Sequence, residues 1–283
     1  MPLPTSPVIR RVRLGAELRQ LRRREALTLE QVCDRLGWAS TSKLSRIELG
    51  QSRPDLADVL DLLDVYEVPS SARDALIVIA RDAATSRGWW KALAEMGERQ
   101  RTYAELEAGA ARIVEYQPAV VPGLLQTPAY ARLRLAAAAA VDPEVDVDAE
   151  VRSRMVRQEV LRRVDPPHYT AVLTEAVCER GQTPPEVWRE QLRHLVTMTG
   201  LANVTVRLLP GGAAGLDPLT PYSSYAFPDP ADPRTVMIET LTSDVRLATV
   251  ADVERYERIT DALLGAALSA EETVTVLTGR VDD

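Results

Sequence analysis

Apolar residues recur three or four positions apart through residues 1 to 84, and this spacing predicts a series of short amphipathic helices. The first predicted helix begins at Leu14 and carries basic side chains beside its apolar stripe. The second follows Thr28, whose hydroxyl and the Gln31 side chain have the spacing of a capping box, and it stops at Gly37. Three more segments of this kind follow. The pattern therefore predicts a compact bundle of five short helices.

The third of these helices lies between Gly37 and Gly50, where the sequence is GWASTSKLSRIELG. Ser40 stands at a capping position, and Gly50 stands where a left-handed residue ends a helix. Because each helical residue advances by about 100°, burying Leu44 and Ile47 turns the polar residues outward or to the flanks. These polar residues are Thr41, Ser42, Lys43, Ser45 and Arg46. An exposed face of hydrogen-bond donors and positive charge is typical of a helix that contacts DNA.

The charged residues of this segment each have two alternative roles. Glu48 lies nearer the inward side of the helix, and we expect it to pair with an arginine of the first helix, such as Arg19 or Arg22. Lys43 and Arg46 either solvate a surface helix or contact DNA. Their place on the outward face of a well-delimited second helix favours contact with DNA.

Charge is distributed unevenly along the chain. The whole sequence has a formal net charge of −7, yet residues 1 to 54 contain eleven Lys and Arg against five Asp and Glu. Because attraction to phosphate is screened over about 8 Å in physiological salt, the local surplus matters more than distant acidic residues. We expect Arg53, just outside the third helix, to contact phosphates. Arg10, Arg11 and Arg13 precede the first predicted helix, either as a basic arm or as a solvated tail.

Because of the predicted helices and the motif between Gly37 and Gly50, the segment from Leu14 to Ala84 resembles the xenobiotic-response-element type of helix-turn-helix. This type has the λ-repressor-like fold. Its most specific motif is S-x-S-K-L-S-R-I-E-x-G, which ends at Gly50. The resemblance implies that the third helix enters the major groove, with Lys43 nearer the phosphates. The residues then expected at base edges are Thr41, Ser42 and Arg46. Such domains bind two half-sites about one helical turn apart, which implies a homodimer on a near-palindromic operator of double-stranded DNA.

Beyond a boundary predicted near residues 85 to 88, strand-like segments appear among the helices. Apolar runs predict strands at residues 169–177, 203–209 and 235–241. Helices are predicted over residues 103–115, 128–140, 151–163, 185–199 and 250–268. The length of 283 residues suits two domains, a helix-turn-helix domain over 1–84 and a second domain over 88–283. The predicted fold is mainly α, with a five-helix first domain and an α+β second domain that contains a small sheet.

From Trp89 nearly to its end, the chain resembles the uncharacterised C-terminal domain of actinomycete helix-turn-helix regulators that are described as antitoxin-like. The motifs that carry the likeness are, in order, VPGLLQTPAYAR, RMVRQEVL, VLTEAV, REQLRHLV and VMIET. The resemblance implies a transcriptional regulator that is often encoded beside a small acidic partner protein. It does not supply a ligand.

Combinations of residues for catalysis or metal binding are scarce. The chain has two histidines, His168 and His194, which suggest neither a metal site nor a nucleophile-base pair. The glycines at 211, 212 and 215 are not followed by the Lys-Ser/Thr pair or the helix of a phosphate-binding loop. We expect Cys33 and Cys178 to be buried thiols in a reducing compartment. Since no signal peptide or membrane span is recognisable, we expect a cytoplasmic protein with no membrane contact, cofactor or metal.

Several polar side chains of the second domain stand inside otherwise apolar motifs, where burial without a partner costs about 1 to 3 kcal/mol each. They are Tyr116, Gln126, Tyr130, Arg154, Gln158, Glu175 and Glu239. They form either an internal hydrogen-bond network, which is the simpler interpretation, or the lining of a site for a small-molecule effector or a partner protein.

Two classes of function are consistent with this sequence. The first is a sequence-specific transcriptional regulator that is not an enzyme, whose second domain responds to a partner protein or small ligand and holds the dimer together. The alternative is that the second domain is an enzyme localised by a DNA-binding domain, with Glu175 and Glu239 performing acid-base chemistry. The scarcity of His and Cys favours the regulator.

Overall fold

The structure, a computed structural model, describes residues 5–84, 96–142, 144–179, 181–211, 220–240 and 243–282. The chain divides into two compact units. The first unit comprises residues 1–91 with two short segments, 108–110 and 227–233, and the second comprises the remainder. The boundary predicted at residues 85–88 and two of the loop glycines, Gly212 and Gly215, lie outside the described residues.

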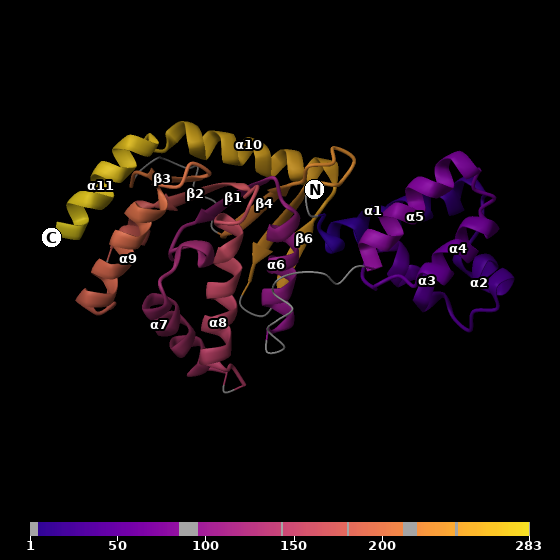
Figure 1. The fold of residues 1–283 in the computed structure, drawn as a ribbon, viewed down its shortest axis with the longest axis horizontal. Helices are drawn as coiled ribbons and strands as arrows, with labels where there is room; N and C mark the ends of the chain where they lie inside the picture. Colours follow the sequence, from indigo (N-terminus) through magenta and orange to yellow (C-terminus); the bar gives the residue numbers. More distant parts are fainter. Residues whose placement is uncertain are drawn as a thin grey trace. The chain divides into compact units, whose positions relative to one another are not determined.

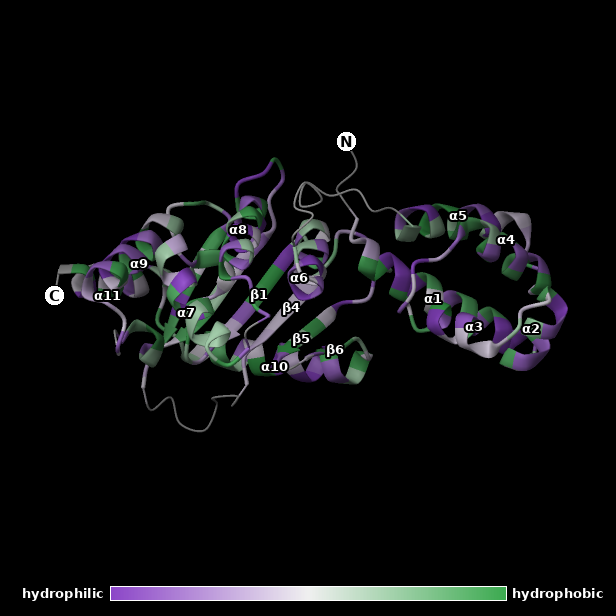
Figure 2. Ribbon diagram, turned by 90° about the horizontal axis from the view of Figure 1, so that it is seen from below, coloured by the Kyte–Doolittle hydropathy of each residue, from purple (hydrophilic) through white to green (hydrophobic). Residues whose placement is uncertain are grey.

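Among the described residues of the first unit, five helices are present (Figure 1). They are α1 (Pro7–Arg24), α2 (Leu29–Leu36), α3 (Thr41–Glu48), α4 (Leu56–Val65) and α5 (Ser70–Ala84). Their ribbons carry alternating bands of hydrophobic and hydrophilic residues (Figure 2), as expected of helices that bury one face. The buried faces meet in one core that includes Leu14, Leu18, Val32, Leu44, Ile47, Val59, Leu63 and Leu76. The predicted five-helix bundle is confirmed.

Helix α1 begins at Pro7, before its predicted start. Proline suits a first helical position, and the Ser6 hydroxyl accepts a hydrogen bond from the helix backbone. Arg10 and Arg13 are therefore helical residues, and each forms an ion pair with Asp229 of the same unit. The basic arm or solvated tail predicted for this segment is wrong, because the helix continues through it.

One six-stranded sheet forms the centre of the second unit, in the order β3-β2-β1-β4-β5-β6. The strands are β1 (Arg112–Gln117), β2 (His168–Thr174), β3 (Val204–Leu209), β4 (Tyr222–Ala226), β5 (Thr235–Glu239) and β6 (Asp244–Leu247). Strands β1, β2 and β3 pair in parallel, and the remaining pairs are antiparallel. The register sets Glu115 opposite Ser223, and Ser223 opposite Met237. Because side chains alternate along a strand, Glu239 shares this face of the sheet.

Helices cover both faces of the sheet (Figure 1). They are α6 (Glu98–Gly109), α7 (Pro128–Ala139), α8 (Val147–Gln158), α9 (Pro185–Met198), α10 (Val250–Ala266) and α11 (Ala270–Asp282). Helix α10 packs on one face through an apolar cluster that includes Tyr116, Val172, Tyr222, Val236, Val253 and Leu263. Helices α6 and α8 lie on the opposite face, where they meet the side of the sheet that carries Glu115.

The α+β architecture is confirmed, but the sheet is larger than predicted. Strand β1 occupies part of the segment 103–115 that was expected to be one helix, because α6 ends at Gly109. All residues of β1 after Arg112 are buried, so the strand lacks the alternation that marks a half-exposed one. Strands β4 and β6 and helix α11 were not predicted. In its described part, the chain has no helix that is long and apolar enough to cross a membrane.

Candidate functional site

Helices α2 and α3 form a helix-turn-helix, and glycines shape it at three points. Gly37 ends α2 with φ of 66°, and Gly50 follows α3 with φ of 65°. Both angles lie in the left-handed region, which glycine adopts without strain. A Cβ added to Gly15 of α1 would lie 2.5 Å from the Ile47 carbonyl oxygen, so the backbones of α1 and α3 approach closely. These contacts hold α3 against the bundle.

A buried ion pair fixes the end of α3. The Arg22 guanidinium donates from Nε and Nη2 to the two carboxylate oxygens of Glu48, at 2.6 and 2.8 Å. Glu48 is 7% exposed, and its hydrogen bonds raise the pKa of Arg22. The expected pairing of Glu48 with an arginine of α1 is confirmed for Arg22. Glu48 therefore stabilises the bundle and is not available to a base.

The outward face of α3 presents the side chains that were predicted to contact DNA. Ser42, Lys43 and Arg46 are exposed, and Thr41 and Ser45 are half-buried. Ser40 occupies the N-cap position, but in the described part of the chain its side chain forms no capping hydrogen bond, so that predicted bond is wrong. Its backbone is extended, with φ of −158°.

Two of the predicted DNA contacts already have partners within the unit. Lys43 Nζ lies 2.6 Å from Asp58 Oδ1 and 4.3 Å from the centroid of the Trp38 ring. Arg53 donates a hydrogen bond to the carbonyl of Ala84. An exposed ion pair contributes only about 0 to 1 kcal/mol, so Lys43 can exchange its partner for a phosphate at little cost.

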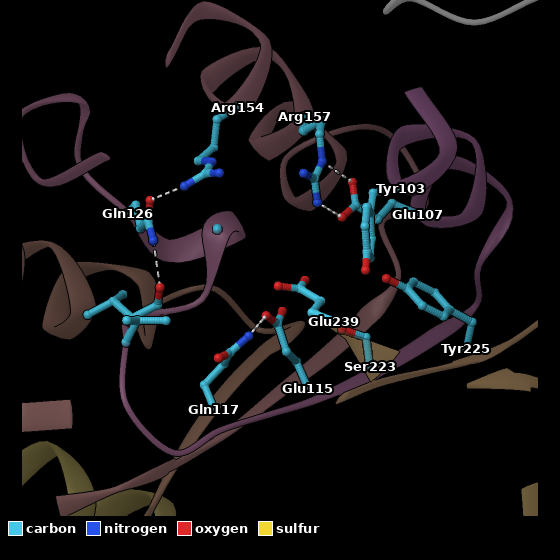
Figure 3. A pocket seen from close by; sticks show the side chains of 13 residues that line it. Tyr103, Glu107, Glu115, Gln117, Gln126, Arg154, Arg157, Ser223, Tyr225 and Glu239 are labelled. Carbon is cyan, nitrogen blue, oxygen red and sulfur yellow. Dashed lines mark hydrogen bonds and ion pairs between the residues drawn. The ribbon is translucent and has the colours of Figure 1, made fainter. Parts of the chain in front are cut away.

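In the second unit, a cavity of about 110 Å³ lies between the sheet and helices α6 and α8 (Figure 3). Residues from helices, strands and the loop after β1 line it, and five of their side chains are acidic or basic. The lining residues are Tyr103, Glu107, Glu115, Gln117, Val120, Val121, Gly123, Gln126, Arg154, Arg157, Ser223, Tyr225 and Glu239. The sheet residues reach it together because the strand register places them on one face.

Arg157 and Glu107 form a buried ion pair at one end of the cavity. The guanidinium donates from Nε to Glu107 Oε2 at 3.0 Å and from Nη2 to the other carboxylate oxygen. It also donates to Gln100 and lies 5.1 Å from the centroid of the Tyr103 ring. Burial opposes the charge of Arg157, but Glu107 outweighs it and raises the pKa of the guanidinium. These two charges satisfy one another.

Glu115 lies in the floor of the cavity, where its hydrogen-bond donors are uncharged groups. Its carboxylate accepts hydrogen bonds from Gln117 Nε2 at 3.0 Å and from the Tyr169 hydroxyl at 2.8 Å. Burial, and then the charge of nearby Glu239, raise the pKa of Glu115 to about 7. Its charge therefore depends on what occupies the cavity.

Arg154 and Tyr103 bring polar atoms to the cavity that lack a partner among the described residues. Arg154 donates from Nη1 to Gln126 Oε1 at 2.7 Å, while its buried Nε has no hydrogen-bond acceptor there. Burial and the charge of Arg157 lower the pKa of Arg154. The Tyr103 hydroxyl is also buried without a partner in the described part, on a side chain that is only 3% exposed. Two donors are thus left for an occupant.

A hydrogen-bond network holds the loop beside Arg154 in place. Gln158 Nε2 donates to the carbonyls of Gly123 and Gln126, at 2.9 and 2.8 Å. Gln126 donates to the carbonyl of Val121 at 2.7 Å. This loop belongs to the VPGLLQTPAY motif, and its anchors come from α8. The network therefore positions Gln126 against Arg154.

Two family matches account for most of the chain. Residues 13–76 match a helix-turn-helix domain family, and residues 100–279 match the family described as a domain of unknown function (DUF5753). The chain belongs to the DUF5753 family. Its helix-turn-helix domain makes it a DNA-binding transcription regulator, in agreement with the geometry of α2 and α3. No curated protein and no solved structure matches the chain.

The seven polar residues predicted as one group divide into three sets in this DUF5753 chain. Gln126, Arg154 and Glu239 line the cavity. Gln158 and Tyr130 support the adjoining loop, since the Tyr130 hydroxyl accepts a hydrogen bond from Val121 N at 3.5 Å.

The structure does not bring Tyr116 and Glu175 to this cavity. Tyr116 follows Glu115 on β1, so strand alternation turns it to the opposite face, into the apolar cluster under α10. The Glu175 carboxylate accepts a hydrogen bond from Gly211 N at 2.9 Å, away from the cavity residues.

Sequence patterns missed seven cavity residues: Tyr103, Glu107, Glu115, Gln117, Arg157, Ser223 and Tyr225. Glu115 escaped because the segment 103–115 was expected to be helical, and Gln117 lies just beyond that segment on the same strand. A signal was present for Arg157, which lies three residues after Arg154 on the same helical face. The remaining residues come from segments that only the fold brings together.

The described residues contain no group of three or more His, Cys, Asp or Glu that could hold a metal ion. His168 begins β2 and His194 lies in α9, far apart in the sequence. Cys33 and Cys178 are buried free thiols, and burial raises the pKa of both. The buried state expected of both cysteines is confirmed.

Proposed function

We propose that this transcription regulator binds a near-palindromic operator as a homodimer and that a small molecule in the cavity of its second unit controls that binding. One observation carries the proposal: buried polar atoms of Arg154 and Tyr103 face a cavity without partners in the described chain. Leaving such groups unpaired costs about 1 to 3 kcal/mol each, and an occupant with matching acceptors removes that cost.

The DNA-binding part of the proposal rests on α3. Arg46 lies exposed in the last turn of the helix, on the face opposite the buried Leu44 and Ile47. An arginine in this position can donate two hydrogen bonds to a guanine edge in the major groove. Thr41 and Ser42 at the start of α3 are further candidates for base contacts. The xenobiotic-response-element resemblance supports the same arrangement.

The operator is testable by selecting DNA fragments with the purified full-length protein and sequencing them. We expect one near-palindromic motif whose half-sites lie about one helical turn apart. Light scattering should give the mass of a dimer in solution. A monomer bound singly to each site, or a selection that enriches no motif, would contradict this part of the proposal.

The cavity is testable by filling it. Ser223 is buried and lines the cavity, so Ser223→Leu places an isobutyl group inside it. A small-molecule fraction of cell extract, freed of protein, should change the operator affinity of the wild type and leave that of the variant unchanged. A thermal melt checks that the variant is folded. An equal response of both proteins excludes the cavity as the sensor.

We further propose that the second unit is not an enzyme and that the protein works in the cytoplasm. Two carboxylates, those of buried Glu115 and half-buried Glu239, share the cavity, and they would be the acid-base pair of an enzymatic alternative. Turnover of a bound small molecule would favour the enzyme. An antitoxin-like response to an acidic neighbouring protein predicts that this protein, rather than the small-molecule fraction, changes operator affinity.

A further inference from the structure

The cavity has opposite charges on opposite sides. Arg154 and Arg157 reach it from α8, whereas Glu115 and Glu239 reach it from strands β1 and β5 of the sheet (Figure 3). Figure 3 shows the two guanidinium groups on the helix side, with the two carboxylates facing them from the sheet. An occupant therefore meets positive charge at one end and negative charge at the other.

Pairing inside the cavity leaves one guanidinium and two carboxylates for an occupant. Arg157 and Glu107 are joined through two hydrogen bonds and neutralise each other. Arg154 bonds only to a neutral amide, that of Gln126. Glu115 likewise accepts from neutral donors. The uncompensated groups are then a guanidinium on the helix side and carboxylates on the sheet side.

The unpartnered atoms define what the helix side requires. Arg154 Nε can only donate a hydrogen bond, so the group that meets it must be an acceptor. The Tyr103 hydroxyl lies in the same cavity but across Arg157 from Arg154 (Figure 3), so it is a donor for another part of the occupant. A carboxylate accepts from Arg154 Nε and brings a negative charge into hydrogen-bond contact with the guanidinium.

The sheet side requires the opposite chemistry. Two carboxylates, Glu115 and Glu239, lie close enough for the charge of one to hinder ionisation of the other. A ligand ammonium group placed against them relieves this repulsion and donates up to three hydrogen bonds. Ser223 adds a hydroxyl on the same side.

The size of the cavity limits the occupant. Its volume is about 110 Å³. For comparison, an apolar protein cavity of about 150 Å³ accommodates benzene. A ligand that lies wholly inside it therefore has about six non-hydrogen atoms or fewer, the size of the smallest amino acids.

We propose that the cavity binds a small zwitterion, with its carboxylate on Arg154 Nε and its ammonium on Glu115 and Glu239. The inference rests on the proposed function, because it names the chemical class of the effector. It goes beyond it in requiring both charges on one compact molecule.

Calorimetric titration of the full-length protein tests the class directly. The zwitterionic probes are glycine, L-alanine and β-alanine, and the single-charge probes are acetate and methylamine. We expect at least one zwitterion to bind about tenfold or more tightly than either single-charge probe, since each lacks one charged hydrogen-bonding end. Equal binding of acetate or methylamine, or no binding of any zwitterion, overturns the proposal.

Two cavity variants with matched controls locate the site. Glu239→Gln removes one charge with little change in shape, and Arg154→Gln replaces the guanidinium with a shorter neutral amide. Each should weaken binding of the zwitterion about tenfold or more. The controls are Glu254→Gln and Arg258→Gln, which remove an exposed pair on α10 and should leave binding unchanged. Thermal melts identify any variant that is not folded, and either cavity variant alone suffices. Unchanged binding in a folded cavity variant overturns the assignment.

Operator affinity, measured with and without the zwitterion that binds best, tests the sensing function separately from ligand binding. Binding in the cavity with a change in operator affinity supports both. Binding in the cavity without such a change supports the zwitterion and contradicts the proposed sensing function. If a molecule of another charge class binds in the same cavity and changes operator affinity, the result supports the sensing function and contradicts the zwitterion.

Discussion

Arg154 and Arg157 lie three residues apart on α8 and face the same cavity, yet the structure gives them different roles. Arg157 is the cation of a buried ion pair, with Glu107 only 2% exposed. Arg154 has a single hydrogen bond to a neutral amide, that of Gln126. We therefore expect Arg157→Met to destabilise the second unit far more than Arg154→Met.

The expected loss of unfolding free energy depends on which polar groups each substitution leaves without a partner. Arg157→Met strands the Glu107 carboxylate in the interior, and breaking a buried pair in this way costs about 3 to 5 kcal/mol. Arg154→Met removes one hydrogen bond from a charged donor, but it also removes a guanidinium whose burial lowers its pKa. The two effects offset each other, so we expect a loss of about 1 kcal/mol or less.

Urea unfolding of the full-length protein distinguishes the two variants. Hydrogen exchange of peptides from β1 and β2 reports on the second unit alone. With a slope of about 2 kcal/mol per molar urea, the midpoint should fall by about 2 M for Arg157→Met and by about 0.5 M or less for Arg154→Met. Equal midpoints, or a larger effect for Arg154→Met, would refute the division of roles.

Three further predictions concern other parts of the molecule. Arg46→Ala should remove about 1 to 3 kcal/mol of preference at one base pair, whereas Arg53→Ala should weaken binding to all sequences alike; identical selected motifs for Arg46→Ala and wild type would exclude the base contact. Gly15→Ala should destabilise the first unit by about 1 to 3 kcal/mol in urea unfolding, because the new methyl group meets α3 backbone at 2.5 Å, whereas Gly279→Ala, in open space, should not destabilise the protein. The pKa of Glu115 is raised to about 7, so folding favours its protonated form; stability should fall as pH rises from about 4.5 to about 7, and a Glu115→Gln variant that keeps the whole slope would contradict this.

The sequence by itself determined the first unit almost completely. Its helices are short, and their signals, the apolar stripe of each helix and the glycines after α2 and α3, lie within the helix or next to it. Leu44 and Ile47 are buried and Gly50 is left-handed, as their spacing predicted. Even the partner of Glu48 could be predicted as an arginine of the first helix, because an inward-facing carboxylate requires a cation on the adjacent helix.

Only the tertiary structure decided the second unit and its cavity. Glu115, Ser223 and Glu239 belong to three strands that are far apart in the sequence, and the strand register alone places them on one face. Their neighbour Tyr116 lies on the opposite face, a difference that a single-residue shift in register would reverse. Periodicity indicates that a segment is buried, but it does not say which segments pair. The sequence therefore shows which charged residues the chain contains. Their arrangement around the cavity depends on the pairing of distant strands, which local sequence patterns do not determine.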